Sequence, residues 1–212
     1  LATTLLMAAA SLAGLLYRSA IYPAEDLLRS FMPNDVVNLF IGVPILLGSM
    51  LLTWRGKLIG LLFWPGALLF VLYNYLAYLF ALPLNAVFLL SLSLVMLSAY
   101  TIIGLVASID GFAVKQRLCG AVPESAAGGI LAGLGILFLL RGIAVILGAL
   151  VKQTPIVAAE LAVMVSDFII NPTCILGGIL LWRRKPLGYA AGLGLLFQLS
   201  MLFIGLIAVM LL

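Results

Sequence analysis

The chain has 212 residues, of which 66% are hydrophobic and 8% are charged, and it contains no histidine. A soluble domain is about one quarter charged, so this chain has too few charges to cover a surface that faces water. Composition also excludes disordered and disulfide-scaffold classes. The lack of histidine excludes His-ligated zinc or haem sites and Ser-His or Cys-His catalytic pairs. We expect an all-α, polytopic membrane protein that is solvated by membrane lipids.

A helix that crosses the hydrocarbon core of a bilayer needs about 20 consecutive apolar residues. Seven stretches meet this requirement and are separated by short polar breaks. We expect spans at 2–22, 36–54, 58–82, 85–109, 126–151, 156–182 and 187–211, which together form a single transmembrane domain, 1–212. The sixth stretch carries acidic residues and an internal proline, so a six-span alternative with a re-entrant segment stays open.

Basic residues in the predicted loops set the orientation of the spans. With seven spans, one side holds seven basic residues, including the cluster 183–185, and the other side holds three, Arg18, Arg29 and Lys152. We therefore expect an integral protein of a prokaryotic plasma membrane, with the N-terminus cytoplasmic and the C-terminus outside. The formal net charge of +4 follows from this topology, and no basic patch with exposed aromatic residues indicates nucleic-acid binding.

Two connecting segments are longer than simple turns. Residues 23–32 begin with proline and place two acids in the first turn, which predicts a short interfacial helix on the outer surface, with Leu27 and Phe31 facing lipid. Residues 110–125 form the longest cytoplasmic loop, which is the expected contact surface for any protein partner. A simpler interpretation of both segments, as solvated connectors, stays open.

The end of the second span and the end of the sixth have similar sequences. Residues 54–60 and 182–188 share the pattern Trp-Arg-x-Lys-x-(Ile/Leu)-Gly at an offset of 128 residues. The same offset relates Pro44 to Pro172. The pattern favours an internal duplication, although an interfacial Trp followed by basic residues is common at span ends and convergence is the alternative.

A duplication would make residues 1–82 and 126–211 equivalent three-helix units of the same orientation, with the helix at 85–109 as a linker. This plan is similar in architecture to the sugar-transporting SWEET proteins, which implies a parallel-repeat transporter with its N-terminus on the opposite side. No sequence motif of that family is present. The segment 72–89, which begins Leu-Tyr-Asn-Tyr, also resembles uncharacterised multi-pass prokaryotic proteins, and that resemblance implies no activity.

Glycine spacing predicts contacts between helices. The pairs Gly129/Gly133 and Gly188/Gly192 each stand four residues apart, as in the Gly-x-x-x-Gly motif. Small residues on one face let two helix backbones approach closely, so we expect both pairs to mark close helix packing.

Ionisable groups at bilayer depth are costly and are candidates for function. Arg141 lies about 15 Å and Asp167 about 18 Å from the outer ends of their spans, at 1.5 Å per residue. A tight turn joins these two spans, so we expect them to be antiparallel neighbours and the two side chains to pair. Either charge left alone would cost several kcal/mol. The pair predicts a binding site or, as the alternative, a static lock on helix register.

Glu160, Asp167 and Asn171 share one face of the sixth span, because they stand seven and four residues apart. That face must point into the bundle, since lipid cannot satisfy its polar groups. Pro172 removes one backbone hydrogen bond, which predicts a broken helix beside the buried acid, as transporters have at their binding sites. Pro44 in the second span is the other candidate hinge.

Three further polar residues complete the candidate substrate site: Asn38 in the second span, and Asn74 and Tyr78 one turn apart in the third. We expect substrate to bind between spans two, three, five and six. Helix bridging and interfacial packing are the alternative roles of these side chains. Glu160 is the expected carrier of a coupling proton, because the neighbouring arginine keeps Asp167 ionised.

These features predict a membrane transporter or facilitator for a small polar or amphipathic molecule. The alternative is a non-catalytic subunit or sensor whose buried charges are structural, and a lipid-modifying intramembrane enzyme comes third. We expect no catalytic residue, metal site or cofactor, because the sequence has no phosphate-binding Gly-x-x-x-x-Gly-Lys-(Ser/Thr) loop and no Asp-x-x-x-Asp pattern.

Overall fold

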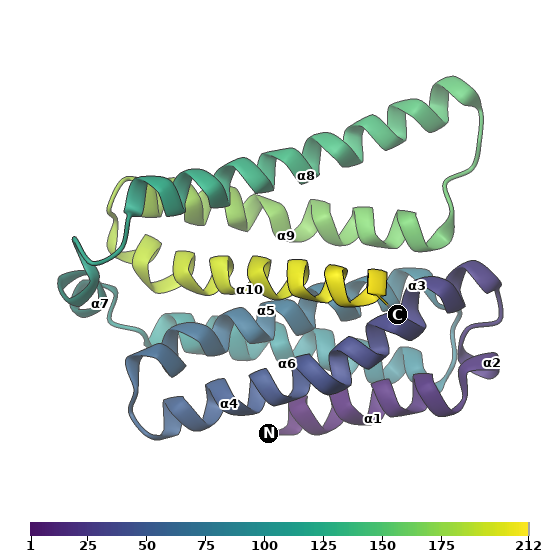
Figure 1. Ribbon diagram of the computed structural model, residues 1–212, viewed down its shortest axis with the longest axis horizontal. Helices are drawn as coiled ribbons and strands as arrows, with labels where there is room; N and C mark the ends of the chain where they lie inside the picture. The colour runs from purple at the N-terminus through teal and green to yellow at the C-terminus, as the bar shows by residue number, and fades with distance from the viewer. Residues whose placement is uncertain (212) are drawn as a thin grey trace.

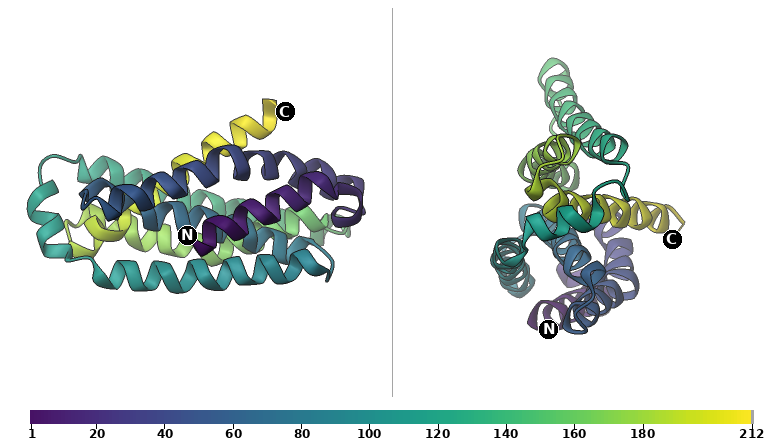
Figure 2. Two further views of the ribbon diagram at one scale, coloured as in Figure 1. Left: turned by 90° about the horizontal axis from the view of Figure 1, so that it is seen from below. Right: turned by 90° about the vertical axis from the view of Figure 1, so that its left-hand side faces the viewer.

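The computed structural model describes residues 1–211, apart from the side chain of Ala86. Within these residues the chain is helical and has no β-strand. The long helices run roughly along one direction, and most connecting segments gather at the two ends of the bundle (Figure 1). We name these ends by the short helices that they carry, the α2 end and the α7 end. The last turns of α10 extend beyond the side of the bundle (Figure 2).

The elements in chain order are α1 (Ala2–Leu16), α2 (Arg18–Ile21), α3 (Glu25–Val37), the π-helical turn η1 (Asn38–Gly42), α4 (Val43–Trp54), α5 (Leu58–Ala81), α6 (Ala86–Ser108), α7 (Gly111–Leu118), α8 (Glu124–Lys152), α9 (Ala158–Trp182) and α10 (Pro186–Leu211). Six helical segments of the described chain are long and apolar enough to cross a membrane: Glu25–Trp54, Leu58–Ala81, Val87–Ser108, Glu124–Lys152, Ala158–Trp182 and Pro186–Leu211. The chain is therefore a multi-pass helical membrane protein.

The first predicted span, 2–22, is divided in the structure. α1 has 15 residues, and α2 follows it as a separate short helix. At 1.5 Å per residue α1 reaches about 22 Å, less than the roughly 30 Å of a hydrocarbon core. The stretch at 156–182, which the six-span alternative treats as re-entrant, instead forms α9, a continuous helix of 25 residues.

The segment 23–32 does not form a separate interfacial helix. From Glu25 the chain runs as one helical segment through α3, η1 and α4 to Trp54. Leu27 and Phe31, which were expected to face lipid, are 6% and 3% exposed. The prediction was wrong because Leu27, Phe31, Asp35 and Asn38 form one helical stripe that continues across the assumed boundary, and this stripe packs against the bundle.

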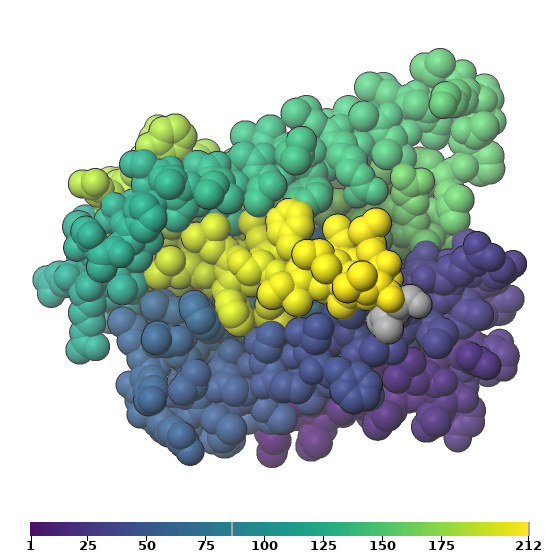
Figure 3. Space-filling view, viewed as in Figure 1, coloured from purple at the N-terminus to yellow at the C-terminus, as the bar shows by residue number. Residues whose placement is uncertain are grey.

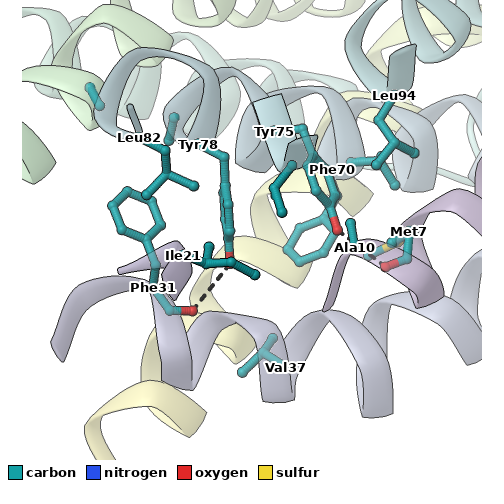
Figure 4. Packing of buried hydrophobic residues seen from close by; sticks show 14 of the residues in the cluster. Met7, Ala10, Ile21, Phe31, Val37, Phe70, Tyr75, Tyr78, Leu82 and Leu94 are labelled. Carbon is teal, nitrogen blue, oxygen red and sulfur yellow. Dashed lines mark hydrogen bonds between the residues drawn. The ribbon is translucent and has the colours of Figure 1, made fainter. Parts of the chain in front are cut away.

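The largest buried cluster lies where α1, α3 and α5 meet. Phe70, Tyr75 and Tyr78 of α5 point toward Met7 of α1 and Phe31 of α3 (Figure 4). The rings of Phe31 and Tyr78 meet edge to face, with centroids 4.7 Å apart, which is a favourable arrangement for an aromatic pair. This cluster fixes α3 over one face of α5.

Glycines spaced seven residues apart seat α8 against α9. A Cβ atom at Gly128, Gly135 or Gly142 would lie 2.5, 2.8 or 3.0 Å from an atom of Gly178, Ile175 or Phe168, respectively. The α9 partner moves toward lower numbers as the α8 glycine moves toward higher ones, so the two helices are antiparallel, as predicted. Small residues every seven positions keep one face of α8 in continuous contact with its neighbour.

The two Gly-x-x-x-Gly predictions had different outcomes. Gly188 and Gly192 do lie at the contact between α10 and α9. Gly129 and Gly133 do not mark packing, because a Cβ at either position would meet no atom within 4 Å. The four-residue spacing identified small residues on α8 but selected the wrong face of the helix.

The turn between α4 and α5 has the same geometry as the turn between α9 and α10. In each turn three successive N–H groups donate to carbonyl groups at the same relative positions of the preceding helix. The middle residue is left-handed in both, with φ 68° at Gly56 and 55° at Arg184. A Cβ at Gly60 or Gly188, four residues later, would lie 2.3 or 2.4 Å from the backbone of the preceding helix.

Gly128→Ala is expected to lower the free energy of unfolding by about 1–3 kcal/mol, because the added Cβ would overlap the backbone of α9. Gly129→Ala is the matched control: it faces open space and should be neutral or slightly stabilising, since alanine favours helix more than glycine does. Thermal unfolding of both variants in one detergent compares them. Equal Tm values would contradict the contact surface assigned to α8.

Candidate functional site

A cavity of about 490 Å³ lies among α3, α5, α8, α9 and α10, toward the α2 end of the bundle. On the surface, α10 lies between α8 and α9 on one side and α3 and α4 on the other (Figure 3). The volume falls within the range of about 300–1,000 Å³ that small-molecule sites occupy. The polar side chains of the lining are those of Ser30, Asn34, Tyr73, Asn74, Arg141, Glu160, Asp167, Asn171 and Gln198.

Asp167 of α9 is held by two hydrogen-bond donors. The hydroxyl of Tyr73 in α5 donates to Oδ1 at 2.9 Å, and the amide of Asn171, one turn further along α9, donates to the same oxygen at 3.2 Å. The Asp167 side chain is only 6% exposed. One carboxylate oxygen is therefore satisfied by neutral donors from two helices.

The structure brings Arg141 to Asp167, as the antiparallel order of α8 and α9 predicts. Gly142 lies close to Phe168, so the neighbouring residues Arg141 and Asp167 lie at about the same level of the two helices. The guanidinium Nη1 lies 3.9 Å from Oδ2, which is an ion pair without a direct hydrogen bond. Within residues 1–211 the Arg141 side chain donates no hydrogen bond, and it is 52% exposed. Its N–H groups are therefore available to another acceptor in the cavity.

Asn74 lines the cavity as predicted and connects two helices. Its Oδ1 accepts a hydrogen bond from Nδ2 of Asn34 in α3 at 3.0 Å, and its own Nδ2 donates to the carbonyl of Phe70 at 2.9 Å. Asn34 was not identified from the sequence. It lies two residues after the predicted interfacial segment 23–32, and that prediction hid the fact that α3 continues into the bundle.

Gln198 of α10 is the main cavity residue that sequence reasoning missed. It is 1% exposed, and its Oε1 finds no hydrogen-bond donor in the described part of the chain. A buried acceptor without a partner is costly and requires an explanation. The available signal was a single amide side chain within the apolar helix Pro186–Leu211, at bilayer depth.

Two residues of the predicted substrate site lie elsewhere. Asn38 and Tyr78 are not part of the cavity lining and are 0% and 2% exposed. Tyr78 points toward α3, where its hydroxyl lies 3.1 Å from the carbonyl of Phe31 (Figure 4). The stripe of α3 covers this face of α5, so both side chains belong to the interface of α1, α3 and α5.

Glu160 does line the cavity, but at its rim. It lies in the first turn of α9 and is exposed. The expectation that Glu160 carries a coupling proton depends on burial that the structure does not provide.

The two candidate hinges differ in their surroundings. Pro172 lies inside α9, which remains continuous through it, so the expected break in this helix is not present. Pro44 lies in the first turn of α4 and directly follows the π-helical turn η1. A π-turn absorbs one extra residue per turn and is often found at functional positions. A hinge role for either proline stays a prediction.

Polar contacts close the α7 end of the bundle. The hydroxyl of Tyr189 donates to Oε1 of Glu124 at 2.7 Å, and Arg184 lies 3.7 Å from Oε2 of the same residue. The predicted partner loop 110–125 contains α7, which packs against α10 with Val114 buried. Part of this loop is thus used within the fold.

No protein-family model matches the chain, and comparison with curated proteins and with solved structures finds no match. The chemistry of the cavity therefore follows from its own residues. The guanidinium of Arg141 has free donors and the amide oxygen of Gln198 has no donor, so these residues can bind a polar group of a ligand. The rings of Phe138 and Phe203, with centroids 6.3 Å apart, can contact the apolar part of the same ligand.

Gln198→Met is expected to raise the free energy of unfolding of the ligand-free protein by about 1 kcal/mol, because it removes a buried acceptor that has no partner and keeps a similar volume. Ser200→Ala on the same helix is the control, since Ser200 is exposed and bonds only the carbonyl of Leu196. Thermal denaturation measures the difference. A lower Tm for Gln198→Met than for the wild type would show that Oε1 is already satisfied.

Proposed function

We propose that this protein is a membrane transporter or facilitator for a small polar or amphipathic molecule, which binds in the cavity among α3, α5, α8, α9 and α10. The observation that carries the proposal is that one cavity is lined both by Arg141, whose donors are free, and by Gln198, whose buried Oε1 has no partner within the described residues. Polar groups at bilayer depth are costly and persist where they serve function.

The lining of the cavity indicates the substrate class. The charged side chains of the lining are one guanidinium, one buried carboxylate that accepts from neutral donors, and the carboxylate of Glu160 at the rim, which leaves little net charge for a substrate to balance. A ligand with a neutral or singly charged polar group fits between Arg141 and Gln198. Its apolar part would lie along Phe138, Leu199 and Phe203, which line the same cavity.

The sidedness of the site follows from the charges at the two ends. Seven of the basic residues lie in the segments at the α7 end, against Arg18, Arg29 and Lys152 at the α2 end. The excess of basic residues then places the α7 end in the cytoplasm and the cavity toward the outside. The contacts of Glu124 with Tyr189 and Arg184 then form the cytoplasmic closure.

An internal duplication supports a transport mechanism in which two units move against each other. The equivalent turns after α4 and α9 are one sign of it, and the contact between α5 and α10 is a second. A Cβ at Gly66 would lie 2.3 Å from the carbonyl oxygen of Gly194, the position 128 residues later. Equivalent residues touch each other only close to a two-fold axis. The units 1–82 and 126–211 would rock about this glycine contact, as in a three-plus-one-plus-three transporter of the SWEET kind.

Native mass spectrometry of the gently solubilised protein tests the proposal. We expect a defined small molecule to stay bound to the wild-type protein and to be lost from Arg141→Ala, which removes the free donors. Arg29→Ala is the matched control, because Arg29 forms an exposed ion pair with Glu25 at the surface and should retain the molecule.

The opposite result would be binding of bulk lipid alone, or loss of the molecule from both variants. Either result removes the cavity as a substrate site. A second protein that stays bound to the wild type and to Arg141→Ala alike would instead favour a non-catalytic subunit.

A further inference from the structure

A second buried acid, Asp35 of α3, lies in the interface of α1, α3 and α5, away from the ion pair of the cavity. It is 1% exposed. The hydroxyl of Tyr22 donates to its Oδ2, and the hydroxyl of Tyr78 lies 2.8 Å from its Oδ1. Within residues 1–211 no lysine or arginine forms an ion pair with it. An ionised carboxylate in such a place has no compensating charge.

The hydrogens of this cluster can be counted. The hydroxyl of Tyr78 has one hydrogen and lies within bonding distance of two acceptors, Oδ1 of Asp35 at 2.8 Å and the carbonyl oxygen of Phe31 at 3.1 Å. Figure 4 shows the contact with Phe31. If Asp35 is ionised, the single hydrogen of Tyr78 must be shared between the two acceptors, whereas a neutral Asp35 allows two full hydrogen bonds. Asp35 then donates to Tyr78, Tyr78 donates to Phe31, and Tyr22 donates to the remaining carboxyl oxygen.

The titratable side chains that surround Asp35 are tyrosines, which are poor acceptors for its proton. The titratable groups that face it are Tyr22, Tyr78 and Tyr75, whose ring centroid lies 5.2 Å from that of Tyr78. α1 presents Gly14, where a Cβ would overlap the carboxyl group and the Tyr22 hydroxyl. α10 packs against α3 through Gly205 beside Val37, without an ionisable group there.

The remaining charged groups of the neighbouring elements point away from Asp35. On its own helix, Glu25 and Arg29 bond each other at the exposed start, where Asp26 also lies. Arg18 of α2 is exposed. On α9, Glu160 is exposed at the cavity rim and Asp167 is bonded to Tyr73. The proton on Asp35 is therefore held by tyrosine hydroxyls alone.

The Asp35 cluster shares its walls with the cavity. Phe31, whose carbonyl accepts from Tyr78, lines the cavity, and so do Asn34 and Ala77, the neighbours of Asp35 and Tyr78 in sequence. The bond between Asn34 and Asn74 ties α3 to α5 at this wall. Movement of α3 relative to α5 during substrate binding would separate Asp35 from Tyr78 and admit water from the cavity.

A group that is suited to the ionised state lies one turn further along the same helix. Asn38 is 0% exposed, and neither atom of its amide finds a hydrogen-bond partner in the described residues. Gly14 meets Asp35, and Met7 meets Gly42, so the intervening Asn38 faces the same stretch of α1. Its free N–H donors can serve the carboxylate once the proton has left.

We propose that Asp35 is the proton-binding group of this protein, neutral while α3 packs on α5 and deprotonated when the α3 wall of the cavity moves. On release, the O–H bond of Asp35 breaks, its electrons remain on the carboxylate, and the proton passes to water that enters from the cavity. The bound proton is a property of the cluster itself. Its use as a coupling ion rests on the proposed transport function.

Infrared difference spectroscopy of the protein in lipid nanodiscs tests the bound proton. At neutral pH we expect the C=O stretch of a protonated carboxyl group in the wild type, its loss in Asp35→Asn, and its shift in Tyr22→Phe, which removes one hydrogen bond to the acid. Glu160→Gln, which changes an exposed acid, should keep the band. The absence of a protonated carboxyl band, or a band unchanged in both Asp35→Asn and Tyr22→Phe, overturns the proposal.

Cysteine labelling tests the connection to the cavity without a known substrate. In a Cys119→Ser background, Ser30→Cys places a thiol at the cavity wall, and a membrane-impermeant methanethiosulfonate reports its access to water. We expect the labelling rate to increase over the pH range in which the infrared band of Asp35 disappears. The reference is the labelling rate of the same thiol in a protein that also carries Asp35→Asn. The ratio of the two rates cancels the titration of the thiol itself.

A rate ratio that does not change with pH overturns the coupling of Asp35 to the cavity. Neither measurement uses the cavity ligand, so the outcome is independent of mass spectrometry on the Arg141 variant. If the cavity binds no defined molecule but the Asp35 band is present, the protein has a proton site without a transported molecule. If the cavity binds a molecule but the Asp35 band is absent, transport does not use this proton.

Discussion

Hydrocarbon offers no hydrogen-bond partner, so every acid inside this bundle must be satisfied by the protein, and tyrosine is the residue that satisfies them. Asp35 is bonded by Tyr22 and Tyr78, Asp167 by Tyr73, and Glu124 by Tyr189. A tyrosine buries a large apolar ring among helices and carries one donor at its tip, which suits it to this role. The remaining features of the site depend on which of these acids also has a cation.

Two of the three acids face an arginine, and the third does not. Arg141 lies near Asp167 and Arg184 near Glu124, both at distances beyond a direct hydrogen bond. Asp35 has only hydroxyl groups around it in the described chain. Under the proposals made above, the same acid–tyrosine unit would serve three roles in one fold: a charged binding site, a closure at the α7 end, and a proton site.

Helix α5 is the element that connects the cavity with the proton site. It is the most buried of the six long apolar helices, with 56% of its most apolar stretch inside the protein. Tyr73 and Asn74 face the cavity, while Tyr75 and Tyr78 face α1 and α3. Because one rigid helix carries both faces, a shift of α3 on α5 changes the cavity wall and the Asp35 cluster together.

Sequence reasoning located the long helices and the Arg141–Asp167 pair, because hydropathy finds apolar runs and a tight turn fixes the relative depth of the helices that it joins. It left Asp35 outside the candidate site because the second span was predicted to start at 36, one residue beyond the acid, whereas α3 begins at Glu25. It missed Gln198 because one amide carries no periodicity. The roles of Asp35 and Gln198 depend on the side chains that face them from other helices. A local sequence pattern does not reveal contacts between helices that are distant in the chain.

The two members of the cavity ion pair are not equivalent, and this asymmetry separates binding from folding. Removing the Asp167 carboxylate leaves two buried donors, Tyr73 and Asn171, without an acceptor, which costs stability regardless of any ligand. Removing the Arg141 guanidinium breaks no hydrogen bond within the described chain, and Asp167 keeps both donors. Loss of Arg141 leaves the buried Asp167 carboxylate without a nearby cation, whereas the hydrogen bonds from Tyr73 and Asn171 remain in place. Of the two residues, Arg141 is therefore the better one to change when the proposed ligand binding is to be measured separately from the packing of the bundle.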